Sequence, residues 1–186
     1  MGFADSLQAN ASLAKCWFFG AAGSGESVGA PIHQPDLSSR IAQILAEIGL
    51  EPSSLELELT ESLMVEDAPS AIATLQHLKS LGVSISIDDF GTGYSSLSYL
   101  AQYPFDTLKI DRCFISNITH GCTNAAIVKA IIEMAHCLCL EVIAEGVETE
   151  AEKDFLWRYE CDTMQGYLFS PPLPAADFEQ LLVEGK

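Results

Sequence analysis

Leu55-Glu-Leu-Glu-Leu-Thr60 alternates apolar and polar residues with a period of two, and the helical stretch Pro69–Leu81 follows it, closed by Gly82. This pattern predicts a strand and then a helix. The same order recurs, with predicted strands and helices at Val83–Ile87 and Ser95–Gln102, Thr107–Ile110 and Thr123–Cys139, Glu141–Ala144 and Thr149–Tyr159, and Met164–Phe169 and Ala175–Val183. Such alternation favours right-handed crossovers, so we expect an α/β protein with about five parallel strands and flanking helices.

The chain before the first predicted strand falls into two parts. Asp36 precedes apolar residues at helical spacing up to Ile48, and Gly49 ends the run, so we expect an amphipathic helix with an Asp cap. Residues 1–32 are rich in Ala, Gly and Ser and keep no regular period, which predicts a loose or partly ordered leader. One folded domain is therefore expected over residues 33–186, after a divergent leader over residues 1–32.

Two architectures suit a parallel sheet of this size. An open sheet of five strands would suit a flavodoxin-like fold, whereas a closed (β/α)8 barrel usually requires about 250 residues. The chain has 186 residues, so it is too short for a complete barrel.

Composition restricts the partners of the protein. The formal net charge is −17 and the pI is about 4.3, so nucleic acids and anionic membranes would be repelled, and a phosphate ligand would need a metal ion. No stretch approaches the roughly twenty apolar residues of a membrane span. The apolar run Cys16–Ala22 is near the lower limit for a signal peptide and lies late. We expect no nucleic-acid or membrane partner and a cytoplasmic location.

The cysteines and histidines do not predict a zinc site. The six cysteines lack paired CxxC spacing, and the four histidines lack metal-ligand spacing. We interpret the cysteines as reduced thiols that lie mostly in the core: Cys16, Cys113, Cys122, Cys137, Cys139 and Cys161.

Polar side chains stand instead at the ends of the predicted strands. They are Glu58 and Glu61, Asp88 and Asp89, Lys109 and Asp111, Glu145 and Glu148, and Gln165. In parallel α/β folds the carboxyl ends of the strands meet at one face, where binding and catalytic sites are built. The sequence therefore predicts one site at this face.

The acidic members of this set favour a divalent cation. Adjacent carboxylates at Asp88 and Asp89 would repel each other unless cations or hydrogen bonds compensate. With Glu58 and Glu145 on neighbouring strands, an all-oxygen ligand set suits Mg²⁺ or Mn²⁺ better than zinc. Two such ions could activate a water and neutralise a phosphodiester under in-line attack, and Lys109 could orient that water or neutralise phosphate.

Each residue also has a simpler structural explanation. Single acids after strands often cap helices, which applies to Glu61, Asp111 and Glu148. A buried Lys109 is more often ion-paired than catalytic, and Gln165 could satisfy backbone groups. The complete set, rather than any one member, indicates a site.

Five motifs occur in a fixed order: Glu-Leu-Thr-Glu-Ser (58–62), Asp-Asp-Phe-Gly-Thr-Gly-Tyr-Ser-Ser (88–96), Leu-Lys-Ile-Asp (108–111), Ala-Glu-Gly-Val-Glu-Thr (144–149) and Gln-Gly-Tyr (165–167). In order and spacing they resemble the EAL family of cyclic-di-GMP phosphodiesterases, over roughly His33 to Leu182. This resemblance implies an incomplete TIM-like (β/α) barrel and the opening of cyclic di-GMP to linear pGpG.

The resemblance also implies a role for each site residue. The implied ligands of two Mg²⁺ or Mn²⁺ ions are Glu58, Asp88, Asp89 and Glu145, with Asp88 shared between the ions. The implied catalytic residues are Glu145, Lys109, Gln165 and Glu61. Lys109 and Gln165 would assist the attacking water, and Glu61 would brace the loop Asp89–Tyr94.

Two parts of the family pattern are absent. The sequence has no Glu-Ala-Leu triplet, whose Glu is a metal ligand and whose nearby Arg holds a substrate phosphate. Glu26 falls where the Asn of an Asn-x-Ser strand would stand. We therefore expect the first strands of the barrel to be missing, and a homodimer or other oligomer to cover the open sheet edges.

Two functions remain open on the sequence alone. The expected function is a metal-binding, dimerising or regulatory module that is catalytically impaired in isolation, because a metal-ligating carboxylate is absent. Cyclic di-GMP would then be a weak ligand at best, because the phosphate-binding Arg is absent too. The alternative is an active cyclic-di-GMP phosphodiesterase whose missing ligands come from the leader or a partner chain.

Overall fold

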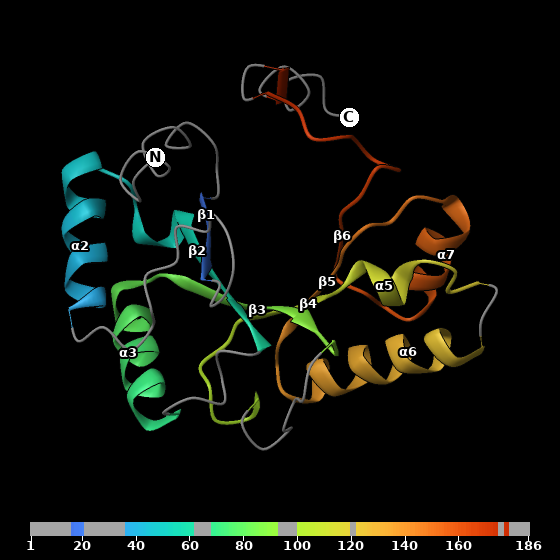
Figure 1. Ribbon diagram of the computed structural model, residues 1–186, viewed down its shortest axis with the longest axis horizontal. Coiled ribbons are helices and arrows are strands. Elements are labelled where there is room, and N and C mark those ends of the chain that lie inside the picture. The colour runs from blue at the N-terminus through green and yellow to red at the C-terminus, as the bar shows by residue number, and fades with distance from the viewer. Residues whose placement is uncertain are drawn as a thin grey trace.

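A parallel β-sheet forms the centre of the protein (Figure 1). The computed structural model describes residues 16–20, 36–61, 68–92, 100–119, 122–174 and 177–178, with the backbone alone for residues 16–20 and 122. The strands are β1 (Cys16–Gly20), β2 (Leu55–Thr60), β3 (Ser84–Phe90), β4 (Thr107–Ile110), β5 (Glu141–Ala144) and β6 (Thr163–Met164). The helices are α2 (Leu37–Ile48), η1 (Pro52–Ser54), α3 (Ala68–Leu81), α5 (Arg112–Ile115), α6 (Cys122–Cys137) and α7 (Glu150–Arg158).

The strand order identifies the architecture. The sheet runs β1-β2-β3-β4-β5-β6, and every neighbouring pair is parallel. A flavodoxin-like sheet reverses its strand order at a switch point, whereas the strands of a (β/α) barrel follow one another in sequence. The fold is therefore α/β with a TIM-barrel-like order of parallel strands and flanking helices, as predicted, and the flavodoxin-like alternative is wrong.

The two faces of the sheet differ in chemistry because side chains alternate along each strand. Leu57, Ile87 and Leu108 are buried and belong to one hydrophobic core, which includes helix residues such as Leu75 of α3 and Val128 of α6. The alternate positions of the same strands are also buried but polar: Glu56, Glu58, Ser86, Asp88, Thr107 and Lys109. The polar face therefore carries the predicted site residues.

Most element predictions agree with the structure. β4 and β5 have their predicted bounds, α3 begins one residue early, and α2 ends at Gly49, whose φ of 68° is left-handed. The Asp cap is wrong in detail, because the Asp36 side chain makes no capping hydrogen bond and its carbonyl accepts from Arg40 N. The predicted helices Ser95–Gln102 and Ala175–Val183 lie largely outside the described residues.

Three elements were not anticipated, of which η1 is a single short turn before β2. β1 lies in the leader, where the sequence shows no persistent strand period, and it pairs with β2 from Cys16 opposite Leu55 to Gly20 opposite Leu59. α5 is a four-residue helix directly after β4. In the part of the chain that the structure describes, no helix is long and apolar enough to cross a membrane.

The predicted core location of the cysteines is mostly wrong. Cys161 is buried, but Cys113, Cys137 and Cys139 are exposed, and all four are free thiols. Cys137 is the last residue of α6, and Cys139 lies in the turn before β5 with a φ of 58°. Helix ends and turns face solvent, so these thiols are exposed although their residue type is usually buried.

Candidate active site

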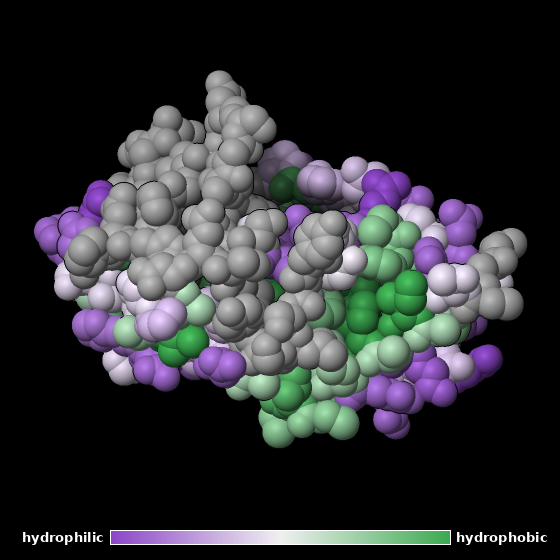
Figure 2. Space-filling view, turned by 60° about the horizontal axis from the view of Figure 1, so that its bottom comes forward, coloured by the Kyte–Doolittle hydropathy of each residue, from purple (hydrophilic) through white to green (hydrophobic). Residues whose placement is uncertain are grey.

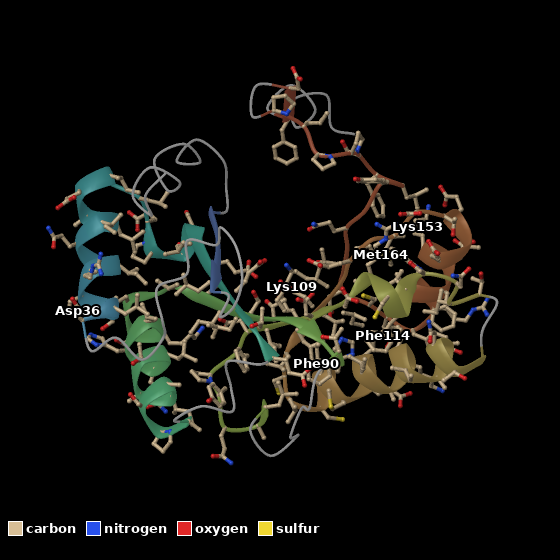
Figure 3. The ribbon with its side chains drawn as sticks, in the orientation of Figure 1. Asp36, Phe90, Lys109, Phe114, Lys153 and Met164 are labelled. Atoms are coloured by element: carbon tan, nitrogen blue, oxygen red, sulfur yellow. The ribbon has the colours of Figure 1, made fainter. Side chains whose placement is uncertain are left out.

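Lys109 stands at the centre of a buried charge cluster on the polar face of the sheet (Figure 3). Its Nζ lies 2.6 Å from Glu58 Oε1, 2.6 Å from Glu145 Oε1 and 3.5 Å from Asp88 Oδ1. These residues come from β4, β2, the end of β5 and β3 in turn. Four of the predicted site residues thus lie together at the carboxyl ends of four neighbouring strands.

A local irregularity in β3 decides where its two aspartates lie. The pairing of β3 with β4 shifts register between Ile87 and Phe90, and Asp89 has a left-handed φ of 54°. Asp88 is buried beside Lys109, whereas Asp89 is partly exposed and does not line the cavity described below. Burial, and then the nearby charges of Asp88 and Asp111, raise the pKa of Asp89. Asp89 therefore flanks the charge cluster.

One ammonium group faces three carboxylates in this cluster. Burial raises the pKa of Glu58 to about 7 despite its hydrogen bond from Lys109, with Asp88 and Glu145 adding to the rise. Burial likewise raises the pKa of Glu145. Burial alone would lower the pKa of Lys109, but its hydrogen bonds to Glu145 and Glu58 raise it above the ordinary value. The excess of negative charge favours a further cation.

The carboxylate oxygens fit a divalent metal ion. Glu58 Oε2 and Asp88 Oδ1 are buried without a hydrogen-bond partner among the residues that the structure describes. Oxygen atoms of this kind are the preferred ligands of Mg²⁺ and Mn²⁺. Within the same described ranges no three His, Cys, Asp or Glu side chains form a ready ligand group. A bound cation would therefore compete with the Lys109 ammonium for Glu58 and Glu145.

The cluster forms the floor of a cavity of about 760 Å³. Glu58, Asp88, Lys109, Glu145 and Gln165 contribute its polar part. The segment after β6 contributes apolar side chains, of which Tyr167 is 64% exposed and Phe169 is 53% exposed. No substrate-binding residue was predicted from the sequence, although Tyr167 and Phe169, two aromatic residues shortly after Gln165, were the available signal. An anionic floor beside aromatic rings suits a ligand with a phosphate and flat bases once a cation is bound.

Glu61 does not line the cavity but binds the backbone directly after β3. Its Oε2 accepts a hydrogen bond of 3.0 Å from Gly91 N, and the residue is buried. This hydrogen bond joins Glu61 to the backbone two residues after Asp89. It supports the predicted role of Glu61 in bracing the loop, and that role stays a prediction. Asp111, by contrast, caps α5 by accepting from Cys113 N at 2.9 Å, as the simpler explanation predicts. Glu148 forms an ion pair with Arg112.

The comparison with known families is specific. The family model described as "EAL domain" matches residues 27–172. The chain belongs to the EAL domain family. The bifunctional diguanylate cyclase/cyclic di-GMP phosphodiesterase MucR of Pseudomonas aeruginosa is 49% identical over 146 residues, which cover 78% of this chain and 21% of MucR. The cyclic di-GMP phosphodiesterase NbdA of the same organism is 48% identical over 146 residues, 78% of this chain and 19% of NbdA.

Solved structures of other EAL proteins show the same fold. The PaMucR phosphodiesterase in complex with c-di-GMP superposes with a TM-score of 0.79 at 39% identity, covering 94% of this chain and 71% of that one. The Klebsiella pneumoniae BlrP1 calcium/cy-diGMP complex gives 0.78 at 29% identity, covering 91% and 42%. A manganese/cy-diGMP complex of BlrP1 gives 0.70 at 34% identity, covering 75% and 36%. The chain spans about a fifth of the length of MucR and NbdA.

Proposed function

We propose that this EAL domain binds cyclic di-GMP together with Mg²⁺ or Mn²⁺ and hydrolyses it to linear pGpG. The observation that carries the proposal is the Lys109 ammonium among three carboxylates, two of them buried, in the lining of the 760 Å³ cavity. Related proteins with cyclic di-GMP phosphodiesterase in their names, and solved complexes with cyclic di-GMP, calcium and manganese, support it.

The metal ions would be held by carboxylates from β2, from β3 and from the end of β5. Glu58 and Asp88 offer buried oxygens, Glu145 lies beside Lys109, and Asp89 flanks Asp88. Divalent ions bound there would neutralise a phosphate and lower the pKa of a bound water. This carboxylate arrangement is why we expect an absolute requirement for Mg²⁺ or Mn²⁺.

The other residues of the cavity bind and orient the reactants. If Glu58 and Glu145 bound a cation, the Lys109 ammonium would instead contact a phosphate oxygen or the attacking water. Gln165 lines the same cavity and can hydrogen-bond that water. Tyr167 and Phe169 expose aromatic surface on which the guanine bases can stack.

Chromatography of the products tests this function. The protein is incubated with cyclic di-GMP and Mn²⁺, beside the variants Asp88→Asn and Asp162→Asn. Asp162 lies outside the cavity lining and controls for the substitution itself. Formation of pGpG by the wild type and by Asp162→Asn, but not by Asp88→Asn, would support the proposal. Absence of both turnover and Mn²⁺-dependent nucleotide binding in the wild type would refute it.

A second candidate function is a binding module with impaired catalysis. β1 reads Cys-Trp-Phe-Phe-Gly, and Phe19 stands opposite Glu58 in the sheet. This strand therefore adds no carboxylate or amide next to Glu58, which would leave the ligand set incomplete. Calorimetry that detects Mn²⁺-dependent binding of cyclic di-GMP without any pGpG would favour this module over the enzyme.

We also propose that the domain self-associates. β1 and β6 pair on one side only within the described residues, and unpaired strand edges favour association. Figure 2 shows an apolar area on the face where α6 lies in Figure 1, and Phe114, Ile127 and Met134 of α5 and α6 are only partly buried. Light scattering at micromolar concentration should give the mass of a dimer. A monomeric mass would contradict this prediction.

A further inference from the structure

The loop that carries Glu145 passes directly beneath the side chain of Arg112. Gly146, the next residue, has a left-handed φ of 70°. A Cβ atom at Gly146 would overlap Arg112 Cγ and lie 2.7 Å from Cβ and 2.8 Å from Cδ of the same side chain. The methylene stem of Arg112 therefore rests on the backbone of Gly146, at a distance that only glycine allows.

The charged end of Arg112 reaches further along the same loop. Its Nη2 lies 2.6 Å from Glu148 Oε1. The Arg112 and Glu148 side chains are 60% and 43% exposed, so the ion pair alone contributes little stability. Its effect is geometric, because the stem of Arg112 packs on Gly146 while the charged end pairs with Glu148, two residues further along the loop.

The loop also contacts the segment after β6. Val147 N donates to Gln165 O at 3.0 Å, and Leu168 N donates to Val147 O at 3.0 Å. A Cβ at Gly166 would overlap the backbone of Val147, so this approach is also close. The loop is therefore held by two sets of contacts, from Arg112 to Gly146 and Glu148 and from residues 165–168 to Val147.

The start of α5 determines where Arg112 stands. Asp111 caps this helix by accepting from Cys113 N at 2.9 Å, and Phe114 N donates to Asp111 O at 3.1 Å. Arg112 is the first residue of α5 and follows β4, which carries Lys109. The short segment from β4 to α5 thus positions two side chains that act on Glu145. Lys109 pairs with its carboxylate, and Arg112 packs on the residue that follows it.

We propose that Arg112 is a positioning residue for Glu145. By covering Gly146 and pairing with Glu148, it keeps the Glu145 carboxylate at the end of β5, where that carboxylate meets Lys109 and can hold a cation. The inference rests on the proposed function of the site as a metal-dependent phosphodiesterase. Gly146 and Glu148 of the Ala-Glu-Gly-Val-Glu motif (144–148) thereby act together with Arg112 to hold the Glu145 carboxylate in place.

Three substitutions separate the stem of Arg112 from its charge. Arg112→Ala removes both, Arg112→Met keeps an unbranched stem, and Arg112→Lys keeps a stem and a charge. Lys129→Ala is the matched control, because Lys129 forms an exposed ion pair with Glu133 at 3.7 Å in α6, outside the cavity lining. Each full-length variant is examined by Mn²⁺ calorimetry, by steady-state kinetics with cyclic di-GMP and by amide hydrogen exchange of Glu145 and Val147.

Arg112→Ala should weaken Mn²⁺ binding by about 10-fold or more, as loss of a partner that orients a ligand does. It should lower kcat more than it changes KM and accelerate exchange of the Glu145 and Val147 amides. Arg112→Lys should restore most of the Mn²⁺ affinity, Arg112→Met should lie between, and Lys129→Ala should match the wild type.

The results that would overturn the inference are distinct from failure of the proposed function. If Arg112→Ala and Arg112→Met unfold more easily but keep wild-type Mn²⁺ affinity and amide exchange in the loop, Arg112 is only structural and the inference is wrong. If the wild type binds no Mn²⁺ and forms no pGpG, the proposed function fails. In that case the amide exchange of Glu145 and Val147 still decides whether Arg112 positions the loop.

Discussion

The buried Lys109 is the residue on which most of the site's electrostatics depends. Lys109→Met should lower the free energy of unfolding of the metal-free protein by about 3–5 kcal/mol, because it leaves the buried Glu58 carboxylate and the partly buried Glu145 carboxylate without their ammonium partner. Urea denaturation measures this loss. Replacing Glu58 by Gln as well should recover part of it, since one of the uncompensated charges is then removed.

An ion pair between α3 and the residue before β4 provides a control for this prediction. Lys79 pairs with Asp106, but their side chains are 34% and 36% exposed, so Lys79→Met should cost less than about 1 kcal/mol. Equal losses for the two lysine variants would show that burial does not set the strength of the Lys109 cluster.

The residues of the site were predictable to different degrees. Glu58, Asp88, Lys109 and Glu145 were predictable because the carboxyl ends of parallel strands meet at one edge. The position of Asp89 was not, because the register shift in β3 and a left-handed backbone decide which aspartate faces the cavity. Neither the register shift nor the left-handed backbone can be recognised from the alternation of apolar and polar residues. The metal-binding and catalytic roles of these residues stay predictions.

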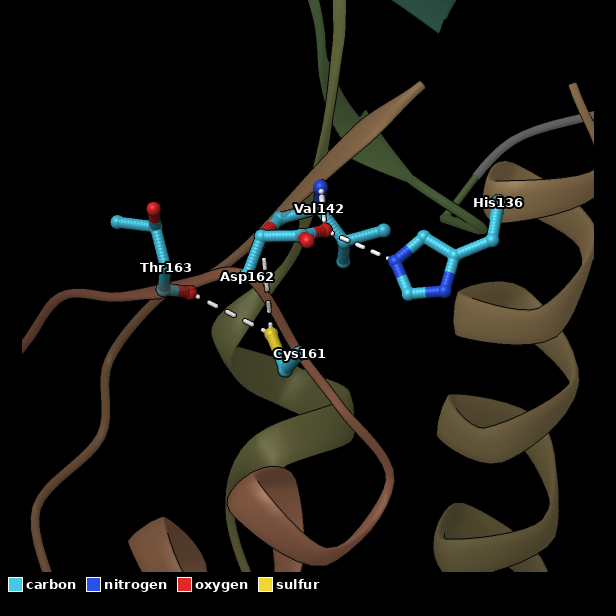
Figure 4. Close-up of polar contacts among 5 residues, drawn as sticks. All are labelled: His136, Val142, Cys161, Asp162 and Thr163. Atoms are coloured by element: carbon cyan, nitrogen blue, oxygen red, sulfur yellow. Dashed lines mark hydrogen bonds and ion pairs between the residues drawn. The ribbon is translucent and has the colours of Figure 1, made fainter. Parts of the chain in front are cut away.

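At the level of elements, two aspartates use the same device to join a strand to its neighbour. Asp106, before β4, accepts from Ile85 N of β3 at 2.8 Å and pairs with Lys79 of α3. Asp162, before β6, accepts from Val142 N of β5 at 2.8 Å and lies 2.9 Å from His136 Nε2 of α6, as Figure 4 shows. Each aspartate therefore ties a strand backbone to a basic side chain of the helix before it.

This device makes stability depend on pH. Burial would raise the pKa of Asp162, but hydrogen bonds from His136 and Val142 N lower it overall. A depressed pKa stabilises the fold above the unfolded value of about 3.9, and this contribution disappears as the pH falls through the folded value. Asp162→Asn should therefore cost up to about 1 kcal/mol at pH 5.5, because the pair is partly exposed, and much less near pH 3. Urea titrations at both pH values measure the difference, and a cost that does not depend on pH would contradict the assignment.

The turn after β5 gives a prediction with an internal control. Gly49 and Gly146 have nearly the same left-handed φ, 68° and 70°, but no atom of the residues that the structure describes lies within 4 Å of a Cβ at Gly49. Gly49→Ala should cost about 1–2 kcal/mol from the backbone alone. Gly146→Ala should cost about 1–3 kcal/mol more because it displaces Arg112. Thermal or urea unfolding compares the two, and similar costs would exclude the close contact.

Helices and strands could be predicted where apolar residues recur along the sequence at a regular spacing. β4 and β5 alternate or are continuously apolar between clear turn residues, and their predicted bounds are those of the structure. β1 was missed because Cys-Trp-Phe-Phe-Gly has no alternation, and α5 because four residues cannot show a helical period. β1 forms because it pairs with β2, and α5 forms because Asp111 caps it. Neither effect produces a periodic pattern of apolar residues in the sequence.

At the scale of the whole molecule, negative charge should couple to metal binding. The formal net charge is −17, and the buried carboxylates add local repulsion that a divalent cation would relieve. Mn²⁺ at about 100 times its Kd should stabilise the native state by about 2.7 kcal/mol if it binds that state alone. Asp88→Asn should reduce the rise in Tm, whereas NaCl of equal ionic strength should not reproduce it. Equal shifts with Mn²⁺ and NaCl would indicate screening of charge without a specific site.

The strictly sequential order of the sheet has a consequence for synthesis. Since each strand from β2 to β6 pairs with the strand before it, every new unit that leaves the ribosome finds its partner already made. No strand has to wait for a later segment to be inserted between its neighbours, as it would in a sheet with reversed order. The domain can therefore be assembled vectorially, unit by unit, while translation is still in progress.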